Sequence, residues 1–335
     1  MHSGRGLRAL KMGKRKIKIR KTNAYHILEY LGFTIIVTIA RSLSVKVLRV
    51  VSGLLGYLLY AAIPRRREIA LQNIRIAFGD QMNEEEIKRL ARQSCKAFFL
   101  TAIEIIRSPF RFDGANIVRD TRYKTEHLEH LFQKAKSIHD QAGGCIFVTP
   151  HLGNWELLPY VSALIGIPLA IVMRPLDNPY LEHAVFSSRI ASGQVMIPKI
   201  NAMFSLERLL RKGKSVGMLP DQSTSRGLRV KFFGANATVT PIPALLALRH
   251  GRPVVVVAAC RTDDPYYFEG FVSDPIWPDP SRVDERSDIE RISREINLKM
   301  EEIIRRFPEQ YLWMHNRWKE SDKKPIFGNT KDKPV

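Results

Sequence analysis

Short apolar runs alternate with amphipathic stretches from residue 144 onward. The apolar runs have the length of strands, and Gly or Pro residues separate them from the helical patterns. Strands that are apolar on both faces and alternate with helices are typical of a parallel sheet covered by helices. The pattern therefore predicts an α/β fold with a mostly parallel central sheet, strands at 145–148, 168–173, 215–218 and 253–259, and helices at 154–166, 179–192, 202–211 and 241–250.

Helical spacing predicts further elements on either side of this region. Residues 65–79 and 83–109 indicate two helices, and Asn83 with Glu86 forms a capping box at the start of the second. We expect these two helices to serve packing and to carry no chemistry. Amphipathic patterns at 121–135 and 288–307 predict two more helices, so the α/β domain should span residues 64–320, followed by a loose tail at 321–335.

The N-terminal region has the pattern of a membrane anchor. Residues 1–22 form a basic extension, and two apolar stretches follow at 24–40 and 50–63. Each is shorter than the roughly 20 residues of a simple span, and basic clusters flank the pair on both sides. No small-residue cleavage site follows the first stretch, so we predict an uncleaved anchor over residues 23–63, either spanning or re-entrant and interfacial. The alternative is a buried helix pair of a soluble protein.

Net charge and cysteine usage narrow the partners and the compartment. The formal net charge is +20, from 53 Lys and Arg against 33 Asp and Glu, which predicts anionic partners: anionic lipid, an acidic protein or nucleic acid. Cys95, Cys145 and Cys260 are far apart and lie in apolar runs. This spacing fits neither a zinc site nor a disulfide framework, so we expect buried free thiols in a reducing compartment.

The strongest candidate chemistry follows the first predicted strand, at His151 and Glu156. Five residues on one helix are about 500° apart, so the two side chains meet only if His151 lies in a turn and Glu156 in the first helical turn. Pro150, Gly153 and Asn154 favour such a turn. A carboxylate on one imidazole nitrogen would orient His151 as a general base. The alternative is a surface His beside a Glu that interacts with the helix dipole.

Three more charged residues lie near the ends of predicted elements at the same sheet edge. Arg174 follows the second strand, Arg189 ends the next helix, and Asp221 follows the third strand. Arginine can bind phosphate or stabilise a developing oxyanion. Asp221 could orient an arginine or a substrate hydroxyl. Each residue alone could be a solvated loop charge, but together they place two guanidinium groups and a carboxylate beside His151.

Five motifs in the chain resemble those of the bacterial lipid A late acyltransferases, the lauroyl/myristoyl acyltransferases within the wider His-x4-Asp/Glu lysophospholipid acyltransferase superfamily. They are HLGNWE at 151–156, RPLDNP at 174–179, DQS at 221–223, FFG at 232–234 and YLWMHNRWK at 311–319. The resemblance implies a glycerolipid acyltransferase-like catalytic domain that moves a fatty acyl chain from acyl carrier protein, or coenzyme A, to a hydroxyl of a glycolipid. It also implies a location at the cytoplasmic face of the cell inner membrane.

The resemblance extends to individual residues. His151 matches the general base and Glu156 its partner, Arg189 and Asp221 match residues that support the site, Arg174 is a weaker match, and Asn154 lies within the first motif. Neither a metal nor another cofactor is implied, beyond the acyl thioester as co-substrate. Since no Ser or Cys lies in a nucleophile motif, we expect direct attack without an acyl-enzyme.

Several alternatives remain open from the sequence. The acceptor could be a lipid A precursor, another glycolipid or a lysophospholipid. A metal-dependent phosphoesterase would need more His and Asp ligands than this sheet edge offers. A membrane-tethered nucleic-acid-binding protein would fit the charge, but no recognition motif is present, so we do not expect nucleic acid as a partner.

Overall fold

The computed structural model describes residues 23–107, 110–113, 116–119, 126–191, 193–199, 202–224, 227–264, 267–281 and 284–319. The predicted basic extension at 1–22 and the predicted tail at 321–335 lie outside these residues.

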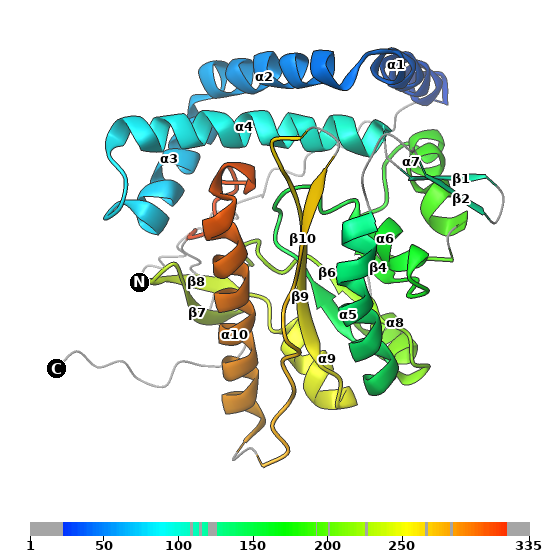
Figure 1. The fold of residues 1–335 in the computed structure, drawn as a ribbon, viewed down its shortest axis with the longest axis vertical. Helices are drawn as coiled ribbons and strands as arrows, with labels where there is room; N and C mark the ends of the chain where they lie inside the picture. The colour runs from blue at the N-terminus through cyan, green and yellow to red at the C-terminus, as the bar shows by residue number, and fades with distance from the viewer. Residues whose placement is uncertain are drawn as a thin grey trace, which may run out of the picture.

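A six-stranded sheet forms the centre of the molecule, in the order β10-β9-β3-β6-β4-β5 (Figure 1). Neighbouring strands run parallel, except that β10 is antiparallel to β9. This confirms the predicted α/β fold with a mostly parallel sheet. The strands are β3 (Ile146–Val148), β4 (Ala170–Met173), β5 (Val195–Pro198), β6 (Val216–Met218), β9 (Val254–Arg261) and β10 (Phe268–Val272).

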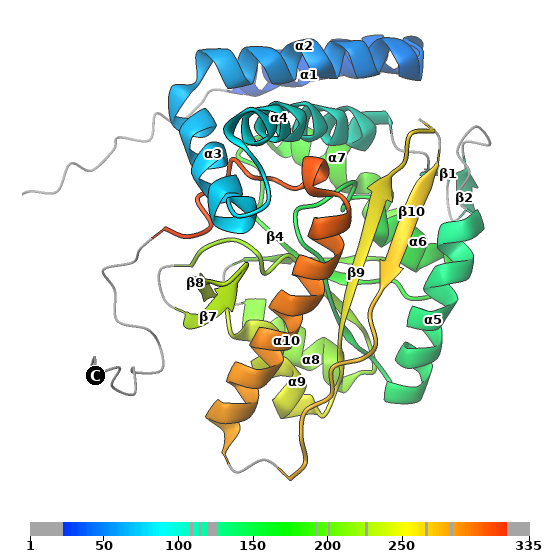
Figure 2. The same cartoon turned by 60° about the vertical axis from the view of Figure 1, so that its left-hand side comes forward.

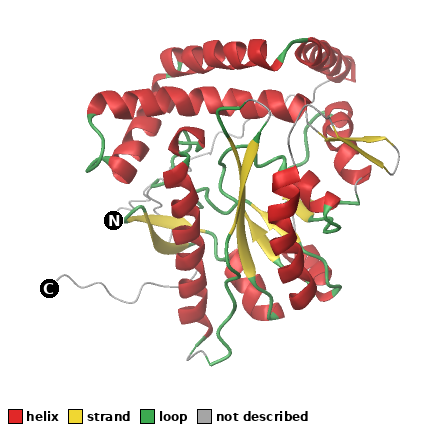
Figure 3. Ribbon diagram, in the orientation of Figure 1, coloured by secondary structure: helices red, strands yellow, loops and turns green. Residues whose placement is uncertain are grey.

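Helices cover both faces of the sheet, as Figure 3 shows in red around the yellow strands. Strand β9 is buried along its whole length, and its alternate side chains enter two separate apolar clusters. Helices α5 (Glu126–Ala142) and α6 (Leu158–Leu164) contribute to one cluster, and α8 (Ala202–Arg211), α9 (Ile242–His250) and α10 (Glu285–Arg306) to the other. The four predicted strands are continuous apolar runs because both of their faces are buried.

The edge strands and two hairpins escaped prediction because they lack such runs. Strand β5 is an edge strand with two exposed residues, and β10 carries a Glu and a Gly. The hairpin of β7 (Leu228–Phe232) and β8 (Ala235–Val239) alternates buried and exposed positions, which is the pattern of a sheet with one wet face. A second hairpin pairs β1 (Phe110–Asp113) with β2 (Asn116–Arg119), and α7 (Pro179–Ala191) lies near it.

Two helices differ from prediction by the most residues at one end. The helix expected at 154–166 begins only at Leu158, because the preceding residues form an irregular turn. The helix expected at 121–135 is α5, which extends to Ala142. The capping box is confirmed: the Asn83 side chain accepts hydrogen bonds from the N–H groups of Glu85 and Glu86, and the Glu86 carboxylate accepts one from Asn83 N–H.

Four helices come before the first hairpin: α1 (Asn23–Ser42), α2 (Val45–Ala62), α3 (Pro64–Phe78) and α4 (Glu84–Arg107). Figures 1 and 2 show α4 between α2 and the rest of the molecule. Helix α2 packs along α4 at very close range, since a Cβ on Gly56 would lie 2.6 Å from the backbone nitrogen of Lys96. Small residues at such a contact let two helix backbones approach each other closely.

The outward surfaces of α1 and α2 are apolar. Both helices are long and apolar enough to cross a membrane, and little of either is buried. Their exposed apolar side chains include Leu28, Leu31, Ile35, Ile36 and Ile39 on α1, and Val50, Leu54, Tyr57 and Leu58 on α2. Contiguous exposed apolar surface of this kind marks an interaction site.

Candidate active site

Two neighbouring strands bring His151 and Asp221 together. Strands β3 and β6 are parallel and adjacent, so their carboxyl ends meet at one edge of the sheet, where α/β folds place their sites. The N–H of Thr149 donates to the carbonyl of Met218 at 3.1 Å, which keeps the two chains paired just beyond β3. His151 and Asp221 each follow within three residues of their strands.

The Asp221 carboxylate holds His151 at two points. One oxygen lies 2.7 Å from His151 Nδ1, and the other accepts a hydrogen bond of 2.8 Å from the His151 backbone N–H. The Asp221 side chain is 3% exposed and that of His151 is 16% exposed. Asp221 is therefore enclosed by protein, and solvent reaches the pair through the imidazole. This geometry makes Nδ1 the protonated nitrogen and leaves the lone pair on Nε2.

The pKa values of the pair reflect burial and mutual attraction. Burial alone would lower the pKa of His151, but the charge of Asp221 and its hydrogen bond together outweigh burial and raise this pKa above 6.5. Burial would raise the pKa of Asp221, but His151 and, more weakly, the Arg317 guanidinium hold it below 3.8. Asp221 is therefore a carboxylate throughout the neutral range and favours the imidazolium form of His151.

The Nε2 atom of His151 faces a residue that the motif analysis left without a role. The side-chain amide nitrogen of Gln222 lies 3.3 Å from it. The Trp155 ring stands edge-on to the imidazole, with 5.2 Å between ring centroids. Both imidazole nitrogens therefore have partners, and neither partner is Glu156.

Glu156 instead forms an ion pair with Arg189 in the last turn of α7. The Arg189 side chain is 8% exposed, and burial lowers its pKa to about 10, so it remains charged at neutral pH. The expected contact between His151 and Glu156 is thus wrong in this structure. The physical reason is that the neighbouring strand supplies a closer carboxylate to His151, while α7 supplies a cation to Glu156.

Gly153 gives the turn between His151 and Glu156 its shape. Its φ is +61°, in the left-handed region, and a Cβ there would lie 2.2 Å from the carbonyl oxygen of Ala259. Only glycine combines this conformation with such a close approach to β9. The next residue, Asn154, donates its backbone N–H to the same carbonyl at 2.8 Å.

The remaining predicted residues lie in different surroundings. Asn154 is buried, and its amide group donates to Glu104 at 2.9 Å, so it supports the turn from inside. Arg174 follows β4 with an exposed side chain. Among the described residues we find no hydrogen bond or ion pair from Arg174 to His151, Glu156 or Asp221.

Residues far along the chain complete the surroundings of Asp221. Burial and then the charge of the Asp221 carboxylate raise the pKa of the Tyr311 hydroxyl well above 10. Arg317 is 1% exposed and lies over the Phe232 ring, 4.9 Å from its centroid. The 311–319 motif had pointed to this segment, but no local pattern assigned either residue to Asp221.

The closing segment, residues 311–319, also contacts the turn that carries His151 directly. The N–H of Leu312 donates to the carbonyl of His151 at 3.0 Å, and Leu152 pairs with Tyr311 as an isolated β-bridge. Asn73 of α3 donates to the carbonyls of Trp313 at 2.7 Å and His315 at 2.6 Å. The closing segment is therefore held by the His151 turn and by α3.

The three cysteines are buried free thiols, as predicted. Burial raises the pKa of Cys95 to about 11 and of Cys145 to about 12, so neither is a thiolate at neutral pH. Within the described ranges, no group of three or more His, Cys, Asp and Glu side chains could hold a metal ion.

A model of the family described as "Bacterial lipid A biosynthesis acyltransferase" matches residues 12–320. The chain belongs to this family. Two relatives of this chain come from Escherichia coli (strain K12). The lipid A biosynthesis palmitoleoyltransferase is 27% identical over 260 residues, covering 77% of this chain and 80% of the relative. The lipid A biosynthesis lauroyltransferase is 24% identical over 270 residues, covering 79% and 83%.

A third relative, the lipid A biosynthesis acyltransferase of Shigella flexneri, is 27% identical over 260 residues. The family model runs from residue 12 to residue 320, so it spans α1 and α2, the sheet and the closing segment alike. The resemblance inferred from five motifs is thereby confirmed at the level of the family. For a lipid A acyltransferase, the chemistry to explain is acyl transfer.

Proposed function

We propose that this acyltransferase moves a fatty acyl group from a thioester of acyl carrier protein, or of coenzyme A, to a hydroxyl of a lipid A precursor. The observation that carries the proposal is the bond from His151 Nδ1 to Asp221, 2.7 Å long, at the carboxyl edge of the sheet. It leaves Nε2 as a proton acceptor on the accessible side. Family membership supports the lipid A class of acceptor.

The reaction needs one base and no covalent intermediate. Nε2 of His151 takes the proton of the acceptor hydroxyl as its oxygen attacks the thioester carbonyl carbon. The carbon–sulfur bond of the tetrahedral intermediate then breaks, and the imidazolium returns the proton to the departing thiolate. Asp221 stabilises the imidazolium between the two steps. The buried, protonated Cys145 is a poor nucleophile, which favours direct attack over an acyl-enzyme.

Gln222 occupies the place that the acceptor hydroxyl must take. Its amide nitrogen is 3.3 Å from His151 Nε2, so the side chain must turn aside when substrate binds. The oxygen of the same amide could then accept a hydrogen bond from another hydroxyl of the acceptor. This exchange keeps Nε2 capped only while no acceptor is bound.

The two arginines are assigned by their surroundings. Arg189 is buried and held by Glu156, so we assign it to the stabilisation of the developing oxyanion. Glu156 positions that guanidinium rather than His151. Arg174 is exposed and unpaired among the described residues, which suits contact with a phosphate of the acceptor.

We assign the enzyme to the cytoplasmic face of the inner membrane, where acyl carrier protein is available. The apolar surface of α1 and α2 supports membrane association, and the net charge of +20 suits an anionic bilayer surface and an acidic carrier protein.

The test is mass spectrometry of lipid A from a deletion strain complemented with wild type, Asp221→Asn or Asp274→Asn. Wild type should restore a missing acyl chain. Asp221→Asn should lower kcat roughly 10⁴-fold, because the wrong imidazole tautomer results, and should not restore the chain. Asp274→Asn makes the same substitution at a carboxylate that is 85% exposed, and should restore it.

Two outcomes would contradict the proposal. If wild type restored no acyl chain on lipid A but acylated another glycolipid or a lysophospholipid, the acceptor class would be wrong. If Asp221→Asn restored the chain as well as wild type does, the His151–Asp221 pair would not be the reaction centre.

A further inference from the structure

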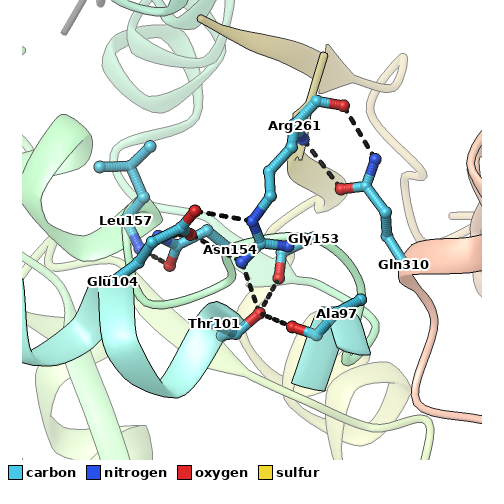
Figure 4. A network of polar contacts seen from close by, with 8 residues as sticks. All are labelled: Ala97, Thr101, Glu104, Gly153, Asn154, Leu157, Arg261 and Gln310. Carbon is cyan, nitrogen blue, oxygen red and sulfur yellow. Dashed lines mark hydrogen bonds and ion pairs between the residues drawn. The ribbon is translucent and has the colours of Figure 1, made fainter. Parts of the chain in front are cut away.

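A buried polar network lies beneath the turn that carries His151 (Figure 4). Its side chains come from α4, the turn itself, β9 and the short 3-10 helix η1 (Pro308–Gln310), so four distant segments of the chain meet there. None of its members except Gly153 and Asn154 belongs to the motifs from which the family was inferred. The network has no place in the reaction as described so far.

A buried ion pair forms the centre of the network. The Glu104 carboxylate of α4 accepts hydrogen bonds from Arg261 Nε at 2.8 Å and Nη2 at 2.6 Å. The side chains are 12% and 6% exposed. The Glu104 oxygen bound to Nη2 also accepts the amide of Asn154 at 2.9 Å. The side-chain oxygen of Asn154 in turn accepts the N–H of Leu157 at 3.2 Å, which links the ion pair to the start of α6.

Thr101, one helical turn before Glu104, holds the other side of the turn. Its hydroxyl lies 2.8 Å from the carbonyl oxygen of Gly153, 3.0 Å from that of Ala97, and 2.5 Å from Arg261 Nη2. Thr101 and Glu104 therefore share one face of α4, at the i, i+3 spacing. The Gly153 carbonyl is tied directly to that face.

Gln310 of η1 connects Arg261 of β9 to Gly153. Its side chain donates to the carbonyl of Arg261 at 2.8 Å and accepts the N–H of Arg261 at 2.9 Å. Its backbone carbonyl accepts the N–H of Gly153 at 3.2 Å. Both polar backbone groups of Gly153 are thus fixed, one by α4 and the other by η1.

Stability alone does not account for a network of this kind. A buried ion pair often contributes no more than well-packed apolar side chains would, because both charges lose their hydration. What the network does supply is geometry: it fixes a turn whose ends carry His151 and Glu156. A misplacement of about 1 Å at a reacting group can cost about 100-fold in rate.

We propose that Thr101, Glu104 and Arg261 are positioning residues, which hold the Gly153–Asn154 turn so that His151 meets Asp221 and the acceptor hydroxyl. The inference rests on the proposed function. It gives α4 a part in catalysis without any contact to substrate, through the hydroxyl–carbonyl and carboxylate–amide bonds to the turn.

The main test compares Thr101→Val with Thr101→Ser in the full chain in membrane vesicles, with acyl-carrier-protein thioester and a lipid A precursor as substrates. Valine keeps the shape and loses the hydroxyl, so kcat should fall about 10- to 100-fold with KM within about two-fold. Serine restores the hydroxyl and should rescue most of the loss. Thr38→Val is the matched control, since Thr38 makes the same bond to the carbonyl four residues earlier, but on α1.

Asn154→Ala provides a second route to the same answer. It cuts the link between Glu104 and the turn but leaves the ion pair with Arg261 intact, so it does not expose an unpaired buried charge. The same loss of kcat is expected. In both variants the acid limb of kcat/KM should move to lower pH, because a looser turn weakens the hold of Asp221 on His151.

The outcomes separate the two proposals. Wild-type kcat and an unchanged pH profile in Thr101→Val and Asn154→Ala would overturn the positioning role. So would a loss of activity that matched the loss of folded protein, with the pH profile unmoved. An inactive wild type would instead overturn the proposed function, and the positioning role with it.

Discussion

At the scale of single residues, the site depends on which carboxylate His151 contacts. Sequence spacing suggested Glu156, because it is near in the chain and shares the motif. The structure pairs His151 with Asp221, 70 residues away, because β3 and β6 are neighbours in the sheet. A motif records which residues act together at a site, but the sheet order decides which of them touch.

The pairing predicts the pH dependence of the reaction. As the proposed base, His151 can accept a proton only when neutral, and Asp221 raises its pKa above 6.5, so kcat/KM should rise through an acid limb whose midpoint lies above pH 6.5. Nearby His315 does not add to this limb, since burial lowers its pKa. The measurement is kcat/KM against pH. In Asp221→Asn the limb of the residual activity should shift to lower pH, and a midpoint below 6.5 in wild type would contradict the assignment.

At the scale of elements, the apolar pattern predicted the strands that are buried on both faces and missed the strands that have an exposed face or edge. The strands β3, β4, β6 and β9 are apolar runs, and polar residues were correctly expected after the carboxyl ends of β3, β4 and β6. The hairpin β7–β8 and edge strand β5 expose alternate or terminal positions, so their sequences resemble loops. Helix α4 was expected only to pack, because Thr101 and Glu104 are ordinary on an amphipathic helix until β9 places Arg261 opposite them.

The sequence predicted that the chain turns at Gly153, but it could not predict the close approach of Gly153 to the carbonyl oxygen of Ala259. Gly153→Ala should lower the free energy of unfolding by about 2–4 kcal/mol, from the left-handed φ and from the clash with the Ala259 carbonyl. Gly251→Ala is the control: its φ is +59°, but no atom lies within 4 Å of the added Cβ. Conformation alone should cost about 1 kcal/mol there. Thermal unfolding in vesicles measures both, and equal losses would argue against the clash.

At the scale of the whole molecule, the apolar surface of α1 and α2 lies on one side and the site on the other side of α4. Exposed side chains at Val50, Leu54 and Leu58 recur at helical spacing, so they form one stripe along α2. The stripe lies within the predicted anchor at residues 23–63 and identifies the surface of α2 that would contact a membrane. Its apolar character predicts insertion into the boundary region of a bilayer.

Replacing Leu54 and Leu58 with Glu should therefore weaken vesicle binding. Each buried Leu contributes about 1.5–3 kcal/mol, so the double variant should lose at least roughly 100-fold in partitioning. Leu298→Glu, at a Leu that is 55% exposed on α10, is the control and should bind as wild type does. Flotation with anionic vesicles gives the measurement, and equal binding by all three proteins would contradict a membrane role for this stripe.

The close contact at Gly56 has a practical consequence. No side chain separates α2 from the backbone of α4 there, so α2 packs directly against the helix that bears Thr101 and Glu104. A detergent that intercalates between the two helices would disturb the turn at the far side of α4. Activity lost on solubilisation would then be recovered by reconstitution rather than by adding substrate, and the choice of detergent becomes a variable in every purification of this enzyme.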